Sequence, residues 1–372
     1  MKSKLSIVLL AIFLAAFSSI AYAQEDEYVD PCVAEDAMME ESDDMAEMAD
    51  NSDTSFHIIL PNARGDRSFI DSAAAGAERA IEELGVEGVI VETAGVQEHD
   101  AAMRRAVQEE PDLVVSIAVD AAIVEEIVDE FPDQLFAAQE TFFPAPPDYE
   151  NLALFNILTH ENSYLAGIAA GMLTRTGKVG AVGGGDFPGI NLFIFGYEEG
   201  VQSVCPDCEI VVSYVGGSNP FADPVRAKEI ALGMYDEEVD IIYQVAGRSG
   251  EGVLEAASET GNFAIGVDSN QDDLFPGTII LSALKRVDNA VYAFVESVVN
   301  DTYIPGETRV GLAEGSAGLS WDLGVCSRTF DEFGPEDMVE KLPEVRLAIE
   351  EARAAILAGD IVVTNALELA EE

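Results

Sequence analysis

The chain has 372 residues and a formal net charge of −51, with 70 Asp and Glu against 19 Lys and Arg. This excess of negative charge excludes nucleic acid as a partner, because proteins bind nucleic acid by neutralising its phosphates with Lys and Arg. The length exceeds what one hydrophobic core usually supports, and a hydrophobic content of 48% is enough for two cores. The charge extends over the whole chain, which indicates either a halophilic surface adapted to high salt or an acidic secreted protein.

The first 23 residues have the pattern of a secretory signal peptide. Two lysines precede an apolar run, and an Ala-Tyr-Ala site ends at Ala23, where we expect cleavage. A lipoprotein would need a cysteine directly after the apolar run, whereas the first cysteine is Cys32. We therefore expect an exported protein without a lipid anchor, in the periplasm or at the outer face of the cell membrane. No later run is long enough to cross a membrane.

Residues 24–54 carry many Asp and Glu and no Lys or Arg, which predicts an acidic, disordered spacer. Apolar runs then alternate with helical patterns, and this alternation predicts parallel sheets with right-handed crossovers. The predicted strands are 56–60, 88–92, 113–117, 135–138, 152–157, 178–182, 209–214, 241–245 and 263–267. The predicted helices are 68–84, 98–109, 121–131, 161–174, 191–204, 224–237 and 250–259. A short strand and a long helix follow within 278–300, then residues 306–318 and a closing helix over 339–357.

Two such series of strands and helices predict two similar α/β lobes. Three apolar runs end in loops of glycines and carboxylates, at residues 179–186, 241–252 and 263–272. Ligands of open α/β sheets bind at the carboxyl ends of the strands. Glycine lets the backbone approach a ligand closely, and an acid can accept hydrogen bonds from hydroxyl or amino groups. The loops therefore predict a cleft for a small molecule.

The cysteines predict a structural role for one close pair. Cys205 and Cys208 flank a Pro-Asp turn between a predicted helix and the next strand, where a small disulfide is possible in an exported protein. Free thiols, redox chemistry and a metal pair are the alternatives. Nothing in the sequence pairs Cys32 with Cys326.

The usual catalytic signatures fail. Residues 171–178 resemble a phosphate loop, but Val179 stands where Ser or Thr must hold magnesium. The three histidines, His57, His99 and His160, share no metal-ligand spacing and are interpreted as surface or packing residues. We therefore expect neither a catalytic residue nor a metal or cofactor.

A polar turn at residues 66–69 carries the best binding candidates. Asp66 and Ser68 can each cap the helix that follows, and capping alone would explain both. Phe69 can stack on a planar ring, an interaction worth about 1–3 kcal/mol for a nucleobase. The alternative for Phe69 is the first core residue of the helix.

Several ordered blocks resemble the basic membrane protein family of ABC-transporter solute receptors, which contains the PnrA-like purine nucleoside receptors. The resemblance covers nearly all of residues 55–367. The blocks are GDRSF at 65–69, ENSYLAGIAAGMLTRTGKVGAVGG at 161–184, VVSYVGG at 211–217, YQVAGRSGEGVLEAA at 243–257, AIGVDSNQ at 264–271 and LSALKRVDNAVY at 281–292.

The resemblance implies a type I periplasmic-binding-protein fold, with two Rossmann-like lobes of parallel sheet joined by a hinge. We expect the first lobe to comprise residues 55–177 and about 270–305, and the second residues 178–269 and about 306–372. The resemblance also implies a monomer that presents a nucleoside-like ligand to an ABC permease and its ATPase.

By motif position, the resemblance implies that Phe69 stacks on the base and that Asp268 and Lys285 hold the ribose hydroxyls. Glu140 faces the base or the sugar, and Gly247 lets the backbone approach the ligand. Lys285 also compensates the cluster of acids, which would be costly to bury alone.

Three positions depart from the family pattern. Ile70 replaces an asparagine whose amide could read a base edge, and Leu60-Pro61-Asn62 replaces a strand end that is often acidic. Arg248 occupies a position that is commonly small. It either pairs with a surface acid or points toward a ligand that carries an acceptor.

Two other functions use the same residues. A nucleoside-processing enzyme would employ Asp268 or Glu140 as a general base, although no phosphate loop accompanies them. A ligand-presenting sensor subunit would bind in the same cleft and contact a membrane receptor instead of a transporter.

Overall fold

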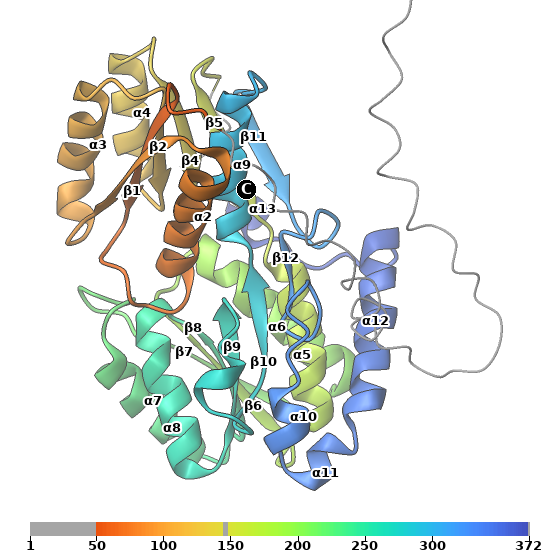
Figure 1. The fold of residues 1–372 in the computed structure, drawn as a ribbon. Helices are drawn as coiled ribbons and strands as arrows, with labels where there is room; N and C mark the ends of the chain where they lie inside the picture. The colour runs from red at the N-terminus through yellow and green to blue at the C-terminus, as the bar shows by residue number, and fades with distance from the viewer. Residues whose placement is uncertain (1–49, 144–147, 371–372) are drawn as a thin grey trace, which may run out of the picture.

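The computed structural model describes residues 50–143 and 148–370, which form two α/β lobes, one above the other in Figure 1. The expected signal peptide and residues 24–49 of the expected spacer lie outside the described residues. The last part of that spacer belongs to the first lobe, since the Asn51 side chain donates a hydrogen bond to the Leu84 carbonyl at 2.7 Å. Within the described residues, no helix combines the length and apolar character needed to span a bilayer.

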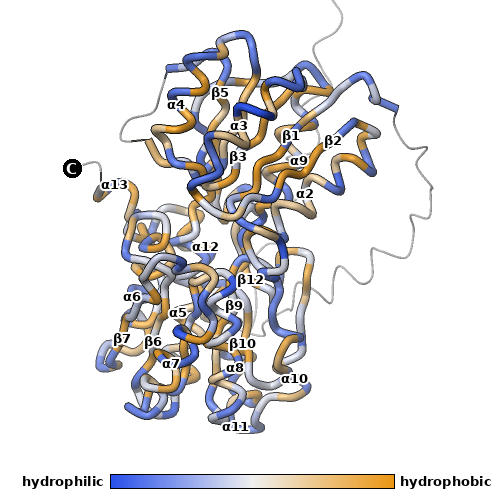
Figure 2. The backbone as a smooth tube through the Cα atoms, turned by 90° about the vertical axis from the view of Figure 1, so that its left-hand side faces the viewer, coloured by the Kyte–Doolittle hydropathy of each residue, from blue (hydrophilic) through white to orange (hydrophobic). Residues whose placement is uncertain are grey.

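The first lobe is built on a parallel six-stranded sheet in the order β11-β5-β4-β3-β1-β2. Its central strands are buried along almost their whole length, as expected when helices cover both faces, and they are largely hydrophobic in Figure 2. The strands are β1 (Ser55–Leu60), β2 (Glu87–Glu92), β3 (Leu113–Ile117), β4 (Leu135–Gln139), β5 (Leu152–Ile157) and β11 (Gly306–Val310). The helices are α2 (Phe69–Leu84), η2 (Val96–Glu98), α3 (His99–Gln108), α4 (Ala121–Glu130) and α9 (Val287–Val299).

The second lobe has a six-stranded sheet in the order β12-β10-β9-β8-β6-β7, parallel except where β12 pairs with β10. All three glycine and acid loops follow strands of this sheet. The strands are β6 (Lys178–Gly183), β7 (Glu209–Tyr214), β8 (Ile241–Val245), β9 (Phe263–Asp268), β10 (Ile279–Lys285) and β12 (Ala317–Leu319). The helices are α5 (His160–Leu173), α6 (Pro188–Val204), α7 (Pro224–Asp236), η3 (Gly247–Ser249), α8 (Gly250–Thr260), η4 (Asp272–Leu274), α10 (Thr329–Phe333), α11 (Glu336–Val339), α12 (Leu342–Ala358) and α13 (Ala366–Ala370).

The structure corrects the expected lobe boundaries at three places. Helix α5 belongs to the second lobe, because it packs closely against α6: a Cβ at Gly167 would lie 2.2 Å from the Tyr197 carbonyl oxygen. Strand β10 pairs with β9 and so also belongs to the second lobe, whereas β11 pairs with β5 in the first. Within the described residues, the chain thus passes between the lobes after β5, after β10 and after β11.

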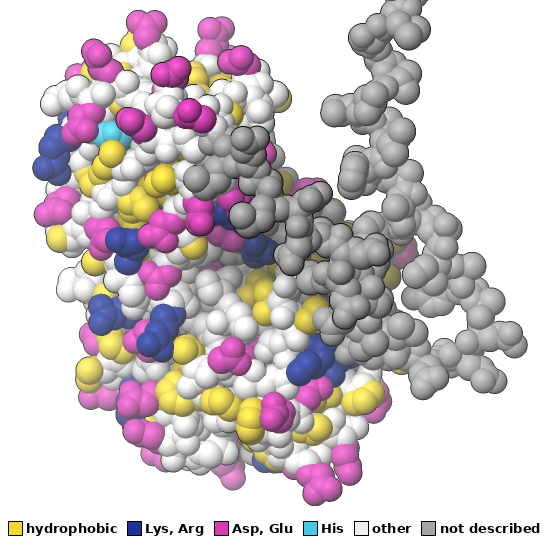
Figure 3. Space-filling view, viewed as in Figure 1, with side chains coloured by type: hydrophobic (Ala, Val, Ile, Leu, Met, Phe, Trp, Pro, Cys, Tyr) yellow, Lys and Arg dark blue, Asp and Glu magenta, His cyan; other side chains and the backbone are white. Residues whose placement is uncertain are grey.

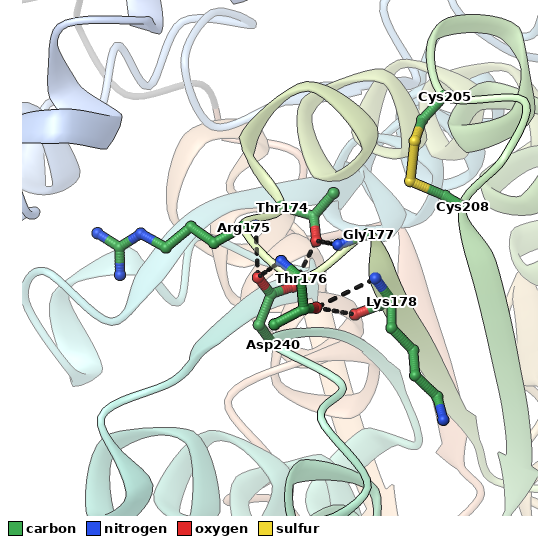
Figure 4. The surroundings of a disulfide bond; sticks show 8 residues. All are labelled: Thr174, Arg175, Thr176, Gly177, Lys178, Cys205, Cys208 and Asp240. Carbon is green, nitrogen blue, oxygen red and sulfur yellow. Dashed lines mark hydrogen bonds between the residues drawn. A yellow bond between two sulfur atoms is a disulfide. The ribbon is translucent and has the colours of Figure 1, made fainter.

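The predicted disulfide between Cys205 and Cys208 is confirmed. It closes the turn between α6 and β7, so the pair is neither free thiols nor a metal site. Figure 4 shows it near the turn that leads into β6, where the Asp240 carboxylate accepts hydrogen bonds from the Thr174 hydroxyl and from the backbone N–H of Arg175. These contacts hold the loops at the amino ends of the strands, away from the carboxyl ends where ligands bind.

Candidate ligand-binding site

The carboxyl ends of strands from both lobes meet around one cavity of about 320 Å³. Pro61 follows β1 and Glu140 follows β4 in the first lobe, while Asp268 and Lys285 end β9 and β10 in the second. The cavity is lined by Pro61, Asn62, Asp66, Phe69, Ile70, Val96, His99, Ala118, Glu140, Phe142, Phe187, Gly189, Ile190, Phe193, Phe221, Val245, Gly247, Asp268 and Lys285. Six of the seven residues singled out in the sequence are among them, and Ser68 is the exception.

Asp66 both lines the cavity and caps α2. Its carboxylate is 3% exposed and accepts hydrogen bonds from the backbone N–H groups of Ser68, Ile70 and Asp71, at 3.1, 2.9 and 3.0 Å. Burial raises the pKa of this carboxyl, and the three backbone donors act in the opposite direction. The capping function predicted for this turn therefore belongs to Asp66.

Ser68 lies behind the cavity and supports Asp268. The Ser68 hydroxyl donates a hydrogen bond to Oδ2 of Asp268 at 2.5 Å, and both side chains are buried. Burial raises the pKa of Asp268 to about 6, while the charge of Lys285 and the Ser68 hydrogen bond lower it. Two further hydrogen bonds cross between the lobes nearby, from Ser269 to the Ser68 carbonyl and from Gln271 to the Arg67 carbonyl.

Lys285 connects the lobes through charge. Its ammonium lies 2.7 Å from Oε2 of Glu140, and both side chains are almost completely buried. The same ammonium lies 5.2 Å from the ring centroid of Phe69 and 5.3 Å from that of Phe193, within the range of cation–π attraction. The expected lobe boundaries place Lys285 in the first lobe, but it ends a second-lobe strand, so its ion pair with Glu140 joins the two lobes.

Four residues that line the cavity have a left-handed backbone conformation at a strand end or within two residues of one. Ala118 follows β3 (φ 49°), Glu140 follows β4 (φ 57°), Gly247 follows β8 (φ 53°) and Asp268 ends β9 (φ 64°). For residues other than glycine this conformation costs about 1–2 kcal/mol each. Such strain concentrates at functional sites, where the surrounding structure enforces it. Here it recurs on both lobes around one cavity.

The cavity is richer in aromatic side chains than the sequence motifs indicate. Besides Phe69, the lining contains Phe142 after β4 and three phenylalanines of the second lobe, Phe187, Phe193 and Phe221. The rings of Phe187 and Phe221 pack edge to face with centroids 6.0 Å apart. Phe187 directly follows one of the glycine and acid loops, so it could have been predicted from the tendency of ligands to bind at the carboxyl ends of strands. The others carry no motif.

Three more positions singled out in the sequence can now be placed relative to the cavity. His99 is 1% exposed, lines the cavity and has Nε2 3.1 Å from the Pro61 carbonyl oxygen, so it is a packing histidine at the wall of the site. Ile70 does face the cavity, as its departure from the family pattern implied. Arg248 is exposed and is not among the lining residues, so the structure does not support the ligand-contact alternative for it.

A second, more open groove of about 440 Å³ shares only Asp268 with this cavity. Arg67, Asp71, Arg286 and Asp288 give it a charged lining, and none of its described lining residues is aromatic. Arg286 is already paired with Asp288 at 2.8 Å. The aromatic cavity is therefore the better candidate for a planar ligand.

Comparisons with known proteins agree with this architecture. The family model described as "ABC transporter substrate-binding protein PnrA-like" (Bmp) matches residues 54–352. Basic membrane protein A of Borreliella burgdorferi is 30% identical over 267 residues, 70% of this chain and 78% of that protein. Basic membrane protein D of the same species is 36% identical over 174 residues, 46% of this chain and 50% of that protein.

Solved structures show the same fold. A solute-binding protein of an ABC transporter system from Aeropyrum pernix K1 superposes with a TM-score of 0.73 at 32% identity, covering 84% of this chain and 93% of that one. A solute-binding protein from Conexibacter woesei has a TM-score of 0.63 at 22% identity, covering 84% and 99%. The likeness to the latter concerns the fold alone.

Proposed function

The chain belongs to the family of PnrA-like ABC transporter substrate-binding proteins. We propose that it captures a nucleoside, with a purine nucleoside as the leading candidate. The protein acts outside the cytoplasm as a monomer and delivers the ligand to a membrane permease and its ATPase. The nucleoside occupies the cavity between the lobes.

The observation that carries the proposal is the combination of phenylalanine rings and buried charges in one cavity. Rings from both lobes suit a planar base, since stacking on an aromatic side chain contributes about 1–3 kcal/mol per base. The cluster of Glu140, Lys285 and Asp268 suits sugar hydroxyls, because a hydrogen bond to a charged group contributes about 1.5–3 kcal/mol. A sugar alone would leave the aromatic rings without a partner.

Each residue has a defined task in this proposal. Phe69 stacks on the base, and Gly247 lets the backbone approach the ligand without a side chain in between. Asp268 and Lys285 bond to the ribose hydroxyls, and Ser68 positions Asp268. One oxygen of Glu140, Oε1, is buried without a hydrogen-bond partner in the described part of the chain, so it can accept a hydrogen bond from the base or the sugar.

Binding is coupled to closure of the lobes about the hinge. The Ser68–Asp268 hydrogen bond and the Glu140–Lys285 ion pair each join a first-lobe residue to a second-lobe residue. A ligand that bonds to Asp268 and Lys285 while stacking on Phe69 contacts both lobes and therefore favours the closed arrangement.

Mass spectrometry of material released from gently purified, denatured protein tests the proposal directly. We expect a nucleoside to be released, and we expect nucleosides to raise the melting temperature at several salt concentrations. If no ring-containing metabolite is released and no nucleoside in a panel changes the melting temperature, the nucleoside proposal is wrong.

Adenosine and its 5′-monophosphate form a matched pair for the same assay. Among the described residues, three carboxylates line the cavity, those of Asp66, Glu140 and Asp268, together with one ammonium, so a phosphate group would be repelled. We expect adenosine to stabilise the protein and the monophosphate to have no effect at the same concentration.

One observation favours a second function. The pKa of Asp268, raised to about 6, is in the range of a general base, as a nucleoside-processing enzyme would need. Time-resolved chromatography of nucleosides incubated with the pure protein separates the two functions. Any turnover that disappears in the Asp268→Asn variant would establish the enzyme.

A further inference from the structure

Phe142 belongs to the first lobe by its backbone and to the second by its side-chain contacts. It follows β4, and the neighbouring Thr141 hydroxyl donates a hydrogen bond to the Val119 carbonyl of the first lobe at 3.0 Å. The Phe142 ring lies against the start of α6 in the second lobe, where a Cβ on Gly189 would come within 2.9 Å of it. The ring therefore spans the junction between the lobes.

The surface that receives this ring is built by α6 and α13. Leu192 of α6 and Ala366 and Leu367 of α13 form a separate small apolar cluster, at 1%, 4% and 6% exposure, with Phe142 and Phe195 packed against it. We name this surface the Phe142 socket: Gly189, Leu192, Phe195, Ala366 and Leu367. Among the described residues of this cluster, Phe142 alone comes from the first lobe.

Polar contacts hold α13 in place on α6. The Thr364 backbone N–H donates a hydrogen bond to Oε2 of Glu199 on α6 at 3.1 Å. The Asn365 side chain accepts a hydrogen bond from the Leu367 N–H at 3.0 Å and so begins the helix. In Figures 1 and 2, α13 lies at the level where the two lobes meet, away from the centre of the second sheet.

Phe142 is also one of the residues that line the ligand cavity, as is Gly189 of its socket. We propose that the socket on α6 and α13 positions Phe142 against the bound ligand, so that the C-terminal helix takes part in ligand capture by holding the first lobe closed. This inference rests on the proposed function for its ligand, but the contact itself exists without ligand. Phe142 acts on the ligand directly, and Leu367 acts through Phe142.

The buried residues of the socket form a small cluster of their own, and among the socket residues it is Phe195 that also packs against the second-lobe core, so disrupting α13 should leave the cores of both lobes folded. Leu367→Asp places a carboxylate in the cluster and should release α13 from α6. Leu369→Asp is the matched control, because Leu369 lies on the same helix but is 54% exposed. Both variants add the same charge two positions apart.

The first measurement needs no ligand. Hydrogen–deuterium exchange of residues 362–370 should become faster in Leu367→Asp and also in Phe142→Ala, whose substitution is in the other lobe. Leu369→Asp should exchange like the unmodified chain. If Phe142→Ala leaves the exchange of α13 unchanged, the socket does not depend on Phe142 and the inference is wrong.

The second measurement uses adenosine. We expect Leu367→Asp to weaken adenosine binding by about tenfold, mainly through faster dissociation, with an unchanged melting temperature of the ligand-free protein. If α13 exchanges faster in Leu367→Asp but the affinity for adenosine is unchanged, the socket does not position Phe142 for binding and the inference is wrong. Should Leu367→Asp fail to fold, the milder Leu367→Ala provides the same comparison, because it also alters the socket without touching the cavity lining. If the unmodified protein binds no nucleoside, the proposed function fails, while the exchange experiment still decides whether the socket exists.

Discussion

The Lys285 ammonium and the Glu140 carboxylate form a 2.7 Å ion pair that crosses from the second lobe to the first. Each residue ends or follows a strand whose carboxyl end faces the cavity, and both side chains are nearly excluded from water. A buried pair of this kind is costly to break, because the remaining charge stays buried without compensation. The pair therefore links lobe closure, stability and the ligand site.

Replacing the lysine should reveal this cost. Lys285→Met leaves Glu140 and Asp268 without their cation and should lower the free energy of unfolding by about 3–5 kcal/mol. Lys178→Met is the control, since Lys178 pairs with the exposed Glu209 at 3.2 Å; its loss should cost at most about 1 kcal/mol. Urea unfolding monitored by circular dichroism measures both. If both variants lose the same free energy of unfolding, the buried Lys285–Glu140 pair contributes no more to stability than the exposed Lys178–Glu209 pair.

The raised pKa of Asp268 predicts a pH-dependent difference in stability. The folded-state pKa is about 6, against 3.8 for an unperturbed aspartate, so between these values the folded chain binds more protons than the unfolded chain. The contribution of Asp268 to stability is therefore complete below about pH 4 and is lost as the pH rises through about 6. The shift corresponds to about 3 kcal/mol.

Asp268→Asn removes this titration. Near pH 4 the variant and the unmodified chain should have similar unfolding free energies, and by pH 7 the variant should be the more stable by up to about 3 kcal/mol. Comparing the two chains at each pH also removes the effect of other groups, including Asp322, whose pKa is raised by burial to about 6. The same variant should lose its stabilisation by nucleosides. A constant difference between pH 4 and 7 would contradict the titration of Asp268.

Gly247 and Gly216 provide a test of backbone access to the ligand. Both have a left-handed conformation, with φ of 53° and 60°, and a Cβ would fit at either one without a clash. Substitution by alanine should therefore cost each variant about 1–2 kcal/mol of stability. Only Gly247 lines the cavity, so Gly247→Ala alone should also weaken nucleoside binding. Isothermal titration calorimetry together with urea unfolding separates the two effects, and an equal loss of affinity in both variants would argue against the site.

Local patterns in the sequence predict the strands, most helices and the strand-end residues of the cavity. The spacing of apolar residues and the positions of glycines can be seen within one short segment of sequence. These patterns identify Asp268 and Gly247 as strand-end residues even when the facing lobe is unknown. The assignment of α5, β10 and β11 to lobes failed because it depends on which strand pairs with which. Strand pairing depends on how side chains pack against neighbouring strands, so it cannot be predicted from the composition of a single strand.

The aromatic lining of the cavity could likewise be predicted only in part from the sequence. Phe69 lies in a recognisable turn, whereas Phe142 and Phe193 look like ordinary core residues in the sequence. They reach the cavity only because the lobes meet there. The Ser68–Asp268 hydrogen bond joins residues 200 positions apart, and nothing in either segment alone predicts it.

The acidic surface predicts that salt stabilises the fold. Carboxylates outnumber basic side chains 70 to 19, and Figure 3 shows Asp and Glu spread over the visible face of both lobes with few Lys and Arg between them. Their mutual repulsion weakens as the Debye length falls from about 10 Å at 0.1 M to about 3 Å at 1 M salt. The free energy of unfolding should therefore rise with KCl concentration near pH 7.

Acid provides the control for this prediction, because protonation removes the charges that salt would screen. Near pH 4, close to the ordinary pKa values of Asp and Glu, many surface carboxylates are neutral, and the gain in unfolding free energy between 0.1 and 1 M KCl should shrink markedly. Urea unfolding at both pH values measures the two gains. If the gain is as large near pH 4 as at pH 7, salt acts by exclusion from the protein surface and not by screening carboxylate repulsion.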